Sequence, residues 1–180
     1  MSARNLARLV GVLALALVLQ VAVLDQIVVA GAHPDLLIVV AAAAGLLLGP
    51  QRGAVVGFAV GIVADTVVNL PFGLSALTYV LVAFGVGMTR SLSAGREARS
   101  ALVLVCAAAA AIGTFAYALI GALLGAQGML GPALVDALVV VTLGALVLAL
   151  PAIAALRWAF AGIGRVRGGF EVPSGGSAAG

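Results

Sequence analysis

The stretch Gly53–Asp65, GAVVGFAVGIVAD, indicates the fold, because twelve apolar or glycine residues precede its single charge. Its glycines recur at every fourth position, so Gly53, Gly57 and Gly61 lie along one face of a helix. Tandem GxxxG spacing of this kind lets a second helix approach closely in lipid. The stretch therefore predicts a helix packed within a membrane protein.

The composition of the whole chain is also that of a membrane protein. Of its 180 residues, 64% are hydrophobic and only 8% are charged, whereas a soluble domain carries about a quarter charged residues. We therefore expect an all-α polytopic membrane protein in contact with membrane lipid.

Six apolar runs follow one another along the sequence. A spanning helix needs roughly 20 residues, and shorter helices are tolerated when the bilayer adapts. The runs predict a six-transmembrane-helix bundle over residues 1–161. The expected spans are 9–29, 35–49, 53–70, 74–89, 101–124 and 134–156. The second and fourth are short, which fits helices that are tilted, partly re-entrant or packed inside the bundle.

Basic residues give the expected orientation. All nine are arginines, and short loops rich in Arg stay in the cytoplasm. Six alternating spans place every arginine on the cytoplasmic side and leave the loops near His33, Pro71 and Gly128 outside. We expect both termini to be cytoplasmic. Residues 162–180, rich in Gly, Ser and Arg, are expected to form a disordered cytoplasmic tail.

Motifs of known chemistry are missing from the sequence. It has no HExxH, CxxC or GxSxG motif and no phosphate-binding loop, and it contains one histidine and one cysteine. Its arginines punctuate apolar runs and form no contiguous basic face of the kind that binds nucleic acid. We therefore expect no enzyme activity, cofactor, metal site or nucleic-acid partner.

Four aspartates lie toward the outer half of the expected bundle. Asp35 and Asp136 fall at helix starts, where free N–H groups and the helix dipole favour a carboxylate, and Asp25 lies near a solvated helix end. Asp65 lies deeper, at the end of the glycine series. Two interpretations of Asp65 stay open: a polar contact within the bundle, to Thr66, Asn69, Ser75 or Tyr79, and a role facing a partner or ligand.

Three segments together resemble a known family. They are His33-Pro34-Asp35-Leu36-Leu37-Ile38-Val39-Val40, then GAVVGFAVGIVAD at Gly53–Asp65, then Pro71-Phe72-Gly73-Leu74-Ser75-Ala76-Leu77-Thr78-Tyr79. Their combination resembles the bacterial rod shape-determining protein MreD over about Pro34–Gly87. The family-motif positions are Pro34, Asp35, Gly57, Gly61 and Asp65.

The resemblance implies a multi-pass protein of the bacterial inner membrane that works in the cell-wall elongation machinery without enzyme activity. Its implied direct partner is MreC. Through that complex it implies contact with MreB, RodA and a class B penicillin-binding transpeptidase, in support of rod shape and lateral peptidoglycan synthesis. Such proteins are similar in architecture to the substrate-binding subunits of energy-coupling-factor transporters.

Two functions from different classes are therefore expected. In the first, the protein is a scaffold that holds MreC through the small-residue face of Gly53, Gly57 and Gly61, with Asp65 at its end. In the second, it is the substrate-binding subunit of a vitamin-type transporter, whose candidate pocket contains Asp35, Asp65, Asn69 and Asp136.

Overall fold

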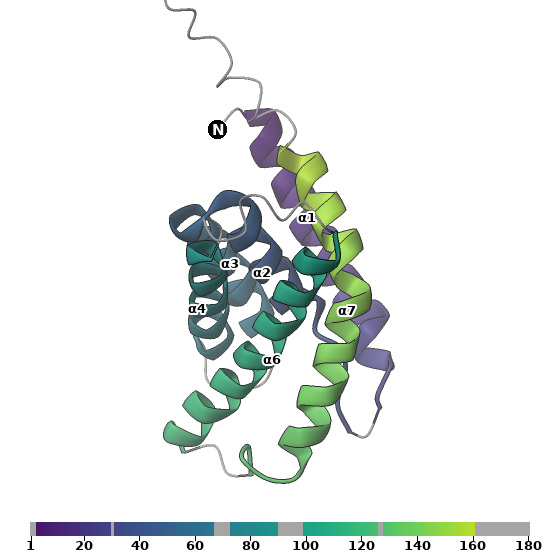
Figure 1. The fold of residues 1–180 in the computed structure, drawn as a ribbon, viewed down its shortest axis with the longest axis vertical. Coiled ribbons are helices and arrows are strands. Elements are labelled where there is room, and N and C mark those ends of the chain that lie inside the picture. The colour runs from purple at the N-terminus through teal and green to yellow at the C-terminus, as the bar shows by residue number, and fades with distance from the viewer. Residues whose placement is uncertain (1–2, 30, 67–72, 90–98, 126–127, 161–180) are drawn as a thin grey trace, which may run out of the picture.

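The computed structural model describes residues 3–29, 31–66, 73–89, 99–125 and 128–160. Within these residues the chain forms six α-helices and one short 3-10 helix, η1, at Leu24–Gln26. The α-helices are α1 Ala3–Ala22, α2 Leu36–Leu48, α3 Pro50–Asp65, α4 Leu74–Met88, α6 Arg99–Leu123 and α7 Ala133–Phe160 (Figure 1). The expected disordered tail at 162–180 lies outside the described residues.

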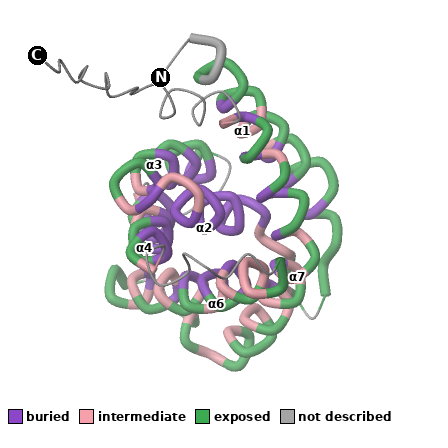
Figure 2. Tube along the Cα trace, turned by 45° about the horizontal axis from the view of Figure 1, so that its top comes forward, coloured by how far each residue is buried: buried purple, intermediate pink, exposed green. Residues whose placement is uncertain are grey.

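Helix α2 forms the centre of the molecule. Eleven of its thirteen residues are buried, from Leu36 through Leu46, and the run Ala41–Ala44 has no exposed surface. Figure 2 shows α2 enclosed by its neighbours, and it contacts α3, α4, α6 and α7. Because every face of α2 meets protein, its sequence is apolar all round and shows no amphipathic stripe. The short second run is thus packed inside the bundle.

Glycines allow the backbones of α2, α3 and α4 to contact one another directly. A Cβ added at Gly53 would lie 2.5 Å from Cα of Gly45 on α2. The turn between the two helices is equally tight: Gly49 adopts φ +85°, and Pro50 supplies the first residue of α3. Three short helices therefore form a dense antiparallel unit.

Helix α1 packs against the rest of the bundle less extensively than the other five α-helices. It packs through one stripe, with Leu9, Ala16 and Gln20 buried, and lies mainly beside α7 (Figure 1). Near the end shared by the two helices, the Arg8 guanidinium lies 5.2 Å from the ring centroid of Trp158. This cation–π contact joins the first helix to the last.

The outer surface is apolar. Helices α3, α4, α6 and α7 turn large side chains outward at helical spacing, for example Leu77, Leu81, Phe84 and Met88 on α4. Among the described residues, three segments are long and apolar enough to cross a bilayer: Leu6–Gln26, Arg99–Leu123 and Ala133–Phe160. An exterior of this kind, on an almost wholly helical chain, is that of an all-α membrane protein.

The arginine-bearing helix ends point in the same direction. The N-terminal ends of α1 and α6, the C-terminal end of α7 and the turn between α2 and α3 all point toward one end of the molecule, the upper end in Figure 1. Arg8, Arg52, Arg99 and Arg157 belong to these ends.

Several helix bounds differ from those expected. The first helix was expected to run to residue 29 but ends at Ala22, because η1 and a tight turn follow it; in that turn Val29 and Ala32 exchange two backbone hydrogen bonds, of 2.8 and 2.9 Å. The third begins at Pro50, three residues earlier than expected, since proline fits the first position of a helix. It ends at Asp65, short of the expected residue 70, and residues 67–70 are outside the described part of the chain.

Candidate functional site

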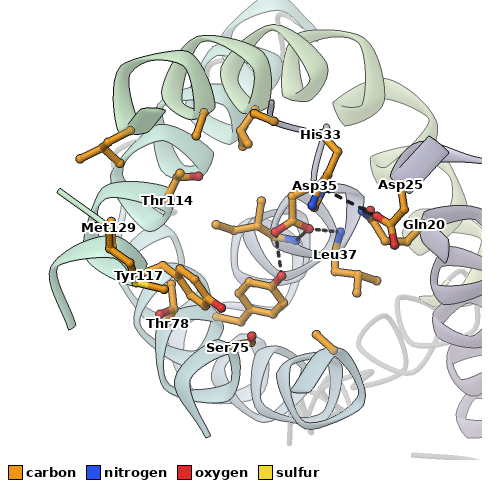
Figure 3. Close-up of a pocket in the computed structure, with 18 of the residues that line it drawn as sticks. Gln20, Asp25, His33, Asp35, Leu37, Ser75, Thr78, Thr114, Tyr117 and Met129 are labelled. Carbon is orange, nitrogen blue, oxygen red and sulfur yellow. Dashed lines mark hydrogen bonds and ion pairs between the residues drawn. The ribbon is translucent and has the colours of Figure 1, made fainter. Parts of the chain in front are cut away.

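A cavity of about 610 Å³ is lined by residues at the end of the bundle away from the helix ends that carry Arg8, Arg52, Arg99 and Arg157. Its walls come from the second half of α1, the segment 31–38, the first turns of α4, the second half of α6 and the start of α7. Figure 3 shows Thr114 and Tyr117 facing Asp35 across its open centre. Residues distant in the sequence therefore meet at one chamber, whose mainly apolar wall contains several polar groups.

Asp35 is the central charged group of this chamber. It is the N-cap of α2, and its Oδ1 accepts hydrogen bonds from the backbone N–H groups of Leu37, at 2.9 Å, and Ile38, at 3.1 Å. The Tyr79 hydroxyl of α4 donates to Oδ2 at 2.7 Å (Figure 3). Capping thus fixes the Asp35 carboxylate at the N-terminus of α2, and Tyr79 of α4 binds its second oxygen.

Gln20 organises the chain between α1 and α2. Its Nε2 donates to Asp25 Oδ1 at 2.8 Å and to the Pro34 carbonyl at 3.1 Å, while its Oε1 accepts from the Leu36 N–H at 2.7 Å. All three bonds serve one buried amide, which satisfies the backbone where the chain enters α2. His33 lies 3.6 Å from the same Asp25 carboxylate.

Thr78 contributes a hydroxyl with no hydrogen-bond partner among the described residues. The side chain is completely buried, and it lines the cavity. Thr114, on the other side, donates to the Ala110 carbonyl at 2.9 Å and keeps its oxygen lone pairs. A buried polar atom without a partner is rare in folded proteins, and the Thr78 hydroxyl has no surface open to the cavity.

Asp65 has a different position from the one expected for a pocket residue. Its buried carboxylate accepts backbone N–H bonds from Gly73 at 2.9 Å, Ser75 at 3.0 Å and Ala76 at 3.2 Å. Helix α4 has no cap of its own, because Gly73 precedes it without a side chain. Asp65 therefore caps α4 from the end of α3, a contact within the bundle, and it is not among the residues that line the cavity.

The glycine series of α3 is occupied within the chain. A Cβ at Gly57 would lie 2.5 Å from the Tyr79 carbonyl oxygen, and one at Gly61 would meet the backbone of Ala76. Both neighbours belong to α4, whereas Gly53 faces α2. A partner protein cannot reach this face while the bundle is intact, so the stripe packs helices of one molecule.

The remaining expected residues are separate from the cavity or outside the description. Asp136 is exposed in the first turn of α7 and does not line the chamber. Asn69 falls in the segment 67–72, which the structure does not describe. Of the three candidate pocket residues that the structure describes, Asp35 alone lies in the cavity wall. The carbonyl group of the neighbouring Pro34 accepts a hydrogen bond from Gln20, which also lines the cavity.

The sequence interpretation missed most of the polar wall. Gln20, Thr78, Thr114 and Tyr117 line the cavity with Asp35 and Tyr79. Each stands within a mainly apolar run, and a polar group inside such a run needs a partner or a water-filled space. That signal was present in the sequence, but it does not show which residues face one another.

The side chains that line the chamber favour a positively charged ligand over a negatively charged one. Asp25, Asp35 and His33 are the titratable side chains near its mouth, and no arginine is among the described residues of its wall. No three His, Cys, Asp or Glu side chains come together as a metal site anywhere in the described part of the chain. Its interior is thus acidic and aromatic, with hydroxyl groups on two sides.

Tyr79→Phe is expected to reduce the free energy of unfolding by about 1.5 to 3 kcal/mol, since a hydrogen bond to a carboxylate is lost while the ring is kept. Unfolding followed by helix circular dichroism in detergent measures the loss. Tyr117→Phe provides the comparison on α6: its hydroxyl bonds the neutral Ser75 side chain and not Asp35, so a smaller loss of about 0.5 to 1.5 kcal/mol is expected. An unchanged Tyr79→Phe variant would contradict the stabilising role of the Asp35 contact.

In comparisons with known proteins, no protein-family model, no curated protein and no solved structure matches the chain.

Proposed function

We propose that this protein is a non-enzymatic component of the bacterial cell-wall elongation machinery, of the MreD type, which binds MreC in the inner membrane. The observation behind this proposal is that the three resembling segments meet in one unit. Asp35 from the first segment binds Tyr79 from the third, and Asp65 from the second caps the helix that contains Tyr79. Residues that the resemblance singles out are thus those that hold α2, α3 and α4 together.

The membrane arrangement follows from the same proposal. Six spans with both termini in the cytoplasm place the arginine-bearing helix ends inside and the cavity outside. The short helix α2 is then enclosed by protein, whereas α4 has one apolar face exposed and is accommodated by locally thinned lipid.

Helix α1 is the surface on which we expect a partner helix to bind. Helix α1 buries a single stripe, and Val10, Leu15 and Val18 are among the large apolar side chains it leaves exposed. In lipid, packing and interhelical hydrogen bonds drive association, and α1 offers the least occupied surface of the bundle. The MreC anchor is proposed to pack here, away from the buried glycine stripe.

Co-purification tests the proposal. The tagged protein, expressed from its own chromosomal locus and extracted in mild detergent, is expected to recover MreC together with cell-wall synthases. Leu15→Trp and Val18→Trp on α1 are expected to reduce MreC recovery severalfold, whereas Val147→Trp, equally exposed on α7, provides the matched control. Full MreC recovery with the α1 variants would exclude α1 as the interface, and absence of MreC from the wild-type sample would exclude the function.

The cavity favours one alternative function, that of a substrate-binding subunit of a membrane transporter. Its volume falls within the roughly 300 to 1,000 Å³ that small-molecule sites occupy. Recovery of a transporter ATPase module in place of MreC, in the same co-purification, would favour this alternative.

A further inference from the structure

We propose that the cavity binds a small organic amine in its protonated form, with the ammonium group at Asp35 and the apolar body between Tyr79, Tyr117 and the start of α7. This binding site is independent of any MreC contact, because it lies in the interior of the bundle and not on the α1 surface. It adds a ligand to the scaffold proposed above.

The charge of the wall selects a cation. Asp35 accepts three hydrogen bonds out of the roughly four that a carboxylate can take, so it retains acceptor capacity toward the cavity. No arginine of the described residues neutralises it from the wall. An anionic ligand would face the Asp35 carboxylate, which has no cationic partner among the described residues, whereas an ammonium group pairs with it in a space of low polarity.

The remaining polar groups suit the same ligand. An ammonium group donates up to three hydrogen bonds and accepts none. The Thr114 oxygen lies in the cavity wall and keeps free lone pairs. Tyr79 and Tyr117 also line the cavity, and aromatic rings attract cations. The cavity thus offers a second acceptor besides Asp35, together with aromatic side chains.

The apolar part of the wall sets the shape of the ligand. Leu17, Leu37, Ile38, Met129 and Val141 line the cavity beside its polar groups. An amine with a hydrocarbon or aromatic body fills this volume better than a polyamine would. The same chemistry comes from two sources, a free amine that enters from the aqueous side and the headgroup of phosphatidylethanolamine.

Three probes of one shape test the charge preference on the full chain in phosphatidylcholine nanodiscs. Phenethylamine, 2-phenylethanol and phenylacetate share a phenyl body and differ in charge. Equilibrium dialysis at neutral pH is expected to show saturable binding of phenethylamine, roughly tenfold weaker binding of the alcohol and no binding of the acid. Equal affinity for the amine and the acid, or no saturable amine binding, would overturn the proposal.

Two variants locate the site. Asp35→Asn keeps an N-cap side chain and the shape of the wall but removes the charge, so the affinity for phenethylamine is expected to fall roughly 30-fold. Asp136→Asn makes the same change at an exposed position outside the cavity and is expected to leave binding unaltered. Helix circular dichroism verifies that both variants are folded. Wild-type affinity in a folded Asp35→Asn variant would place the amine elsewhere.

A lipid arm separates the two sources. Nanodiscs that contain phosphatidylethanolamine are expected to compete with phenethylamine if the natural amine is a lipid headgroup, whereas phosphatidylglycerol nanodiscs are not. Undiminished phenethylamine binding in both lipids assigns the site to a soluble amine. Competition by phosphatidylglycerol equal to that by phosphatidylethanolamine would contradict recognition of the amine.

Discussion

Asp65→Ala is expected to lower the free energy of unfolding by about 2 to 4 kcal/mol, because it leaves three backbone N–H groups at the start of α4 without an acceptor. The bonds to Ser75 and Ala76 are buried, so water cannot replace the carboxylate. Titration with SDS, monitored by helix circular dichroism, measures this difference.

Two related variants separate capping from simple loss of charge. Asp65→Asn keeps one acceptor oxygen and is expected to fall between wild type and Asp65→Ala. Asp136→Ala removes an equally charged residue from the first turn of α7, where it is exposed, and is expected to cost only about 0.3 to 1 kcal/mol through the helix dipole. Equal losses in the two alanine variants would show that Asp65 contributes no more than charge near a helix start.

Gly61→Ala is expected to destabilise the protein by about 2 to 3 kcal/mol, because the added methyl group meets the Ala76 backbone and the Ser75 carbonyl oxygen, which lies 2.8 Å from its position. Backbone cannot rotate away as a side chain can, so α3 and α4 must separate. The same SDS titration measures the effect.

Gly85→Ala is the matched control and is expected to change stability in the opposite direction. This glycine is also in the middle of a helix, but it is exposed and an added Cβ meets nothing within 4 Å. Alanine there gains about 0.5 to 1 kcal/mol from lower backbone entropy in the unfolded chain. A stabilising Gly61→Ala variant would contradict the close approach of α3 to α4.

The fold was largely predictable because lipid imposes simple requirements on a sequence. Long apolar runs had to be helices, and each of the six expected runs has a helical counterpart. Asp35 was also predictable as the start of α2, since a carboxylate after proline fits a helix N-terminus. Its side chain does cap that helix.

The site was less predictable, since its geometry depends on pairs distant in the sequence. Asp35 and Tyr79 are separated by 44 positions, and Gln20 reaches Leu36 across a turn that hydropathy does not reveal. Asp65 was predictable in part. A contact within the bundle, with Ser75 as one candidate, was one of the two interpretations left open, and Asp65 does accept a hydrogen bond from Ser75. That bond comes from the backbone N–H group, which the residue type does not indicate.

The enclosure of α2 has a consequence for biosynthesis. At thirteen residues it is roughly 20 Å long, too short to span a bilayer by itself. Its walls include α6 and α7, which are synthesised after it. A nascent chain that ends after α4 therefore holds a central helix with part of its surroundings missing. The core closes only after α7 has been inserted, so truncations before α7 expose this strongly apolar helix to quality-control proteases.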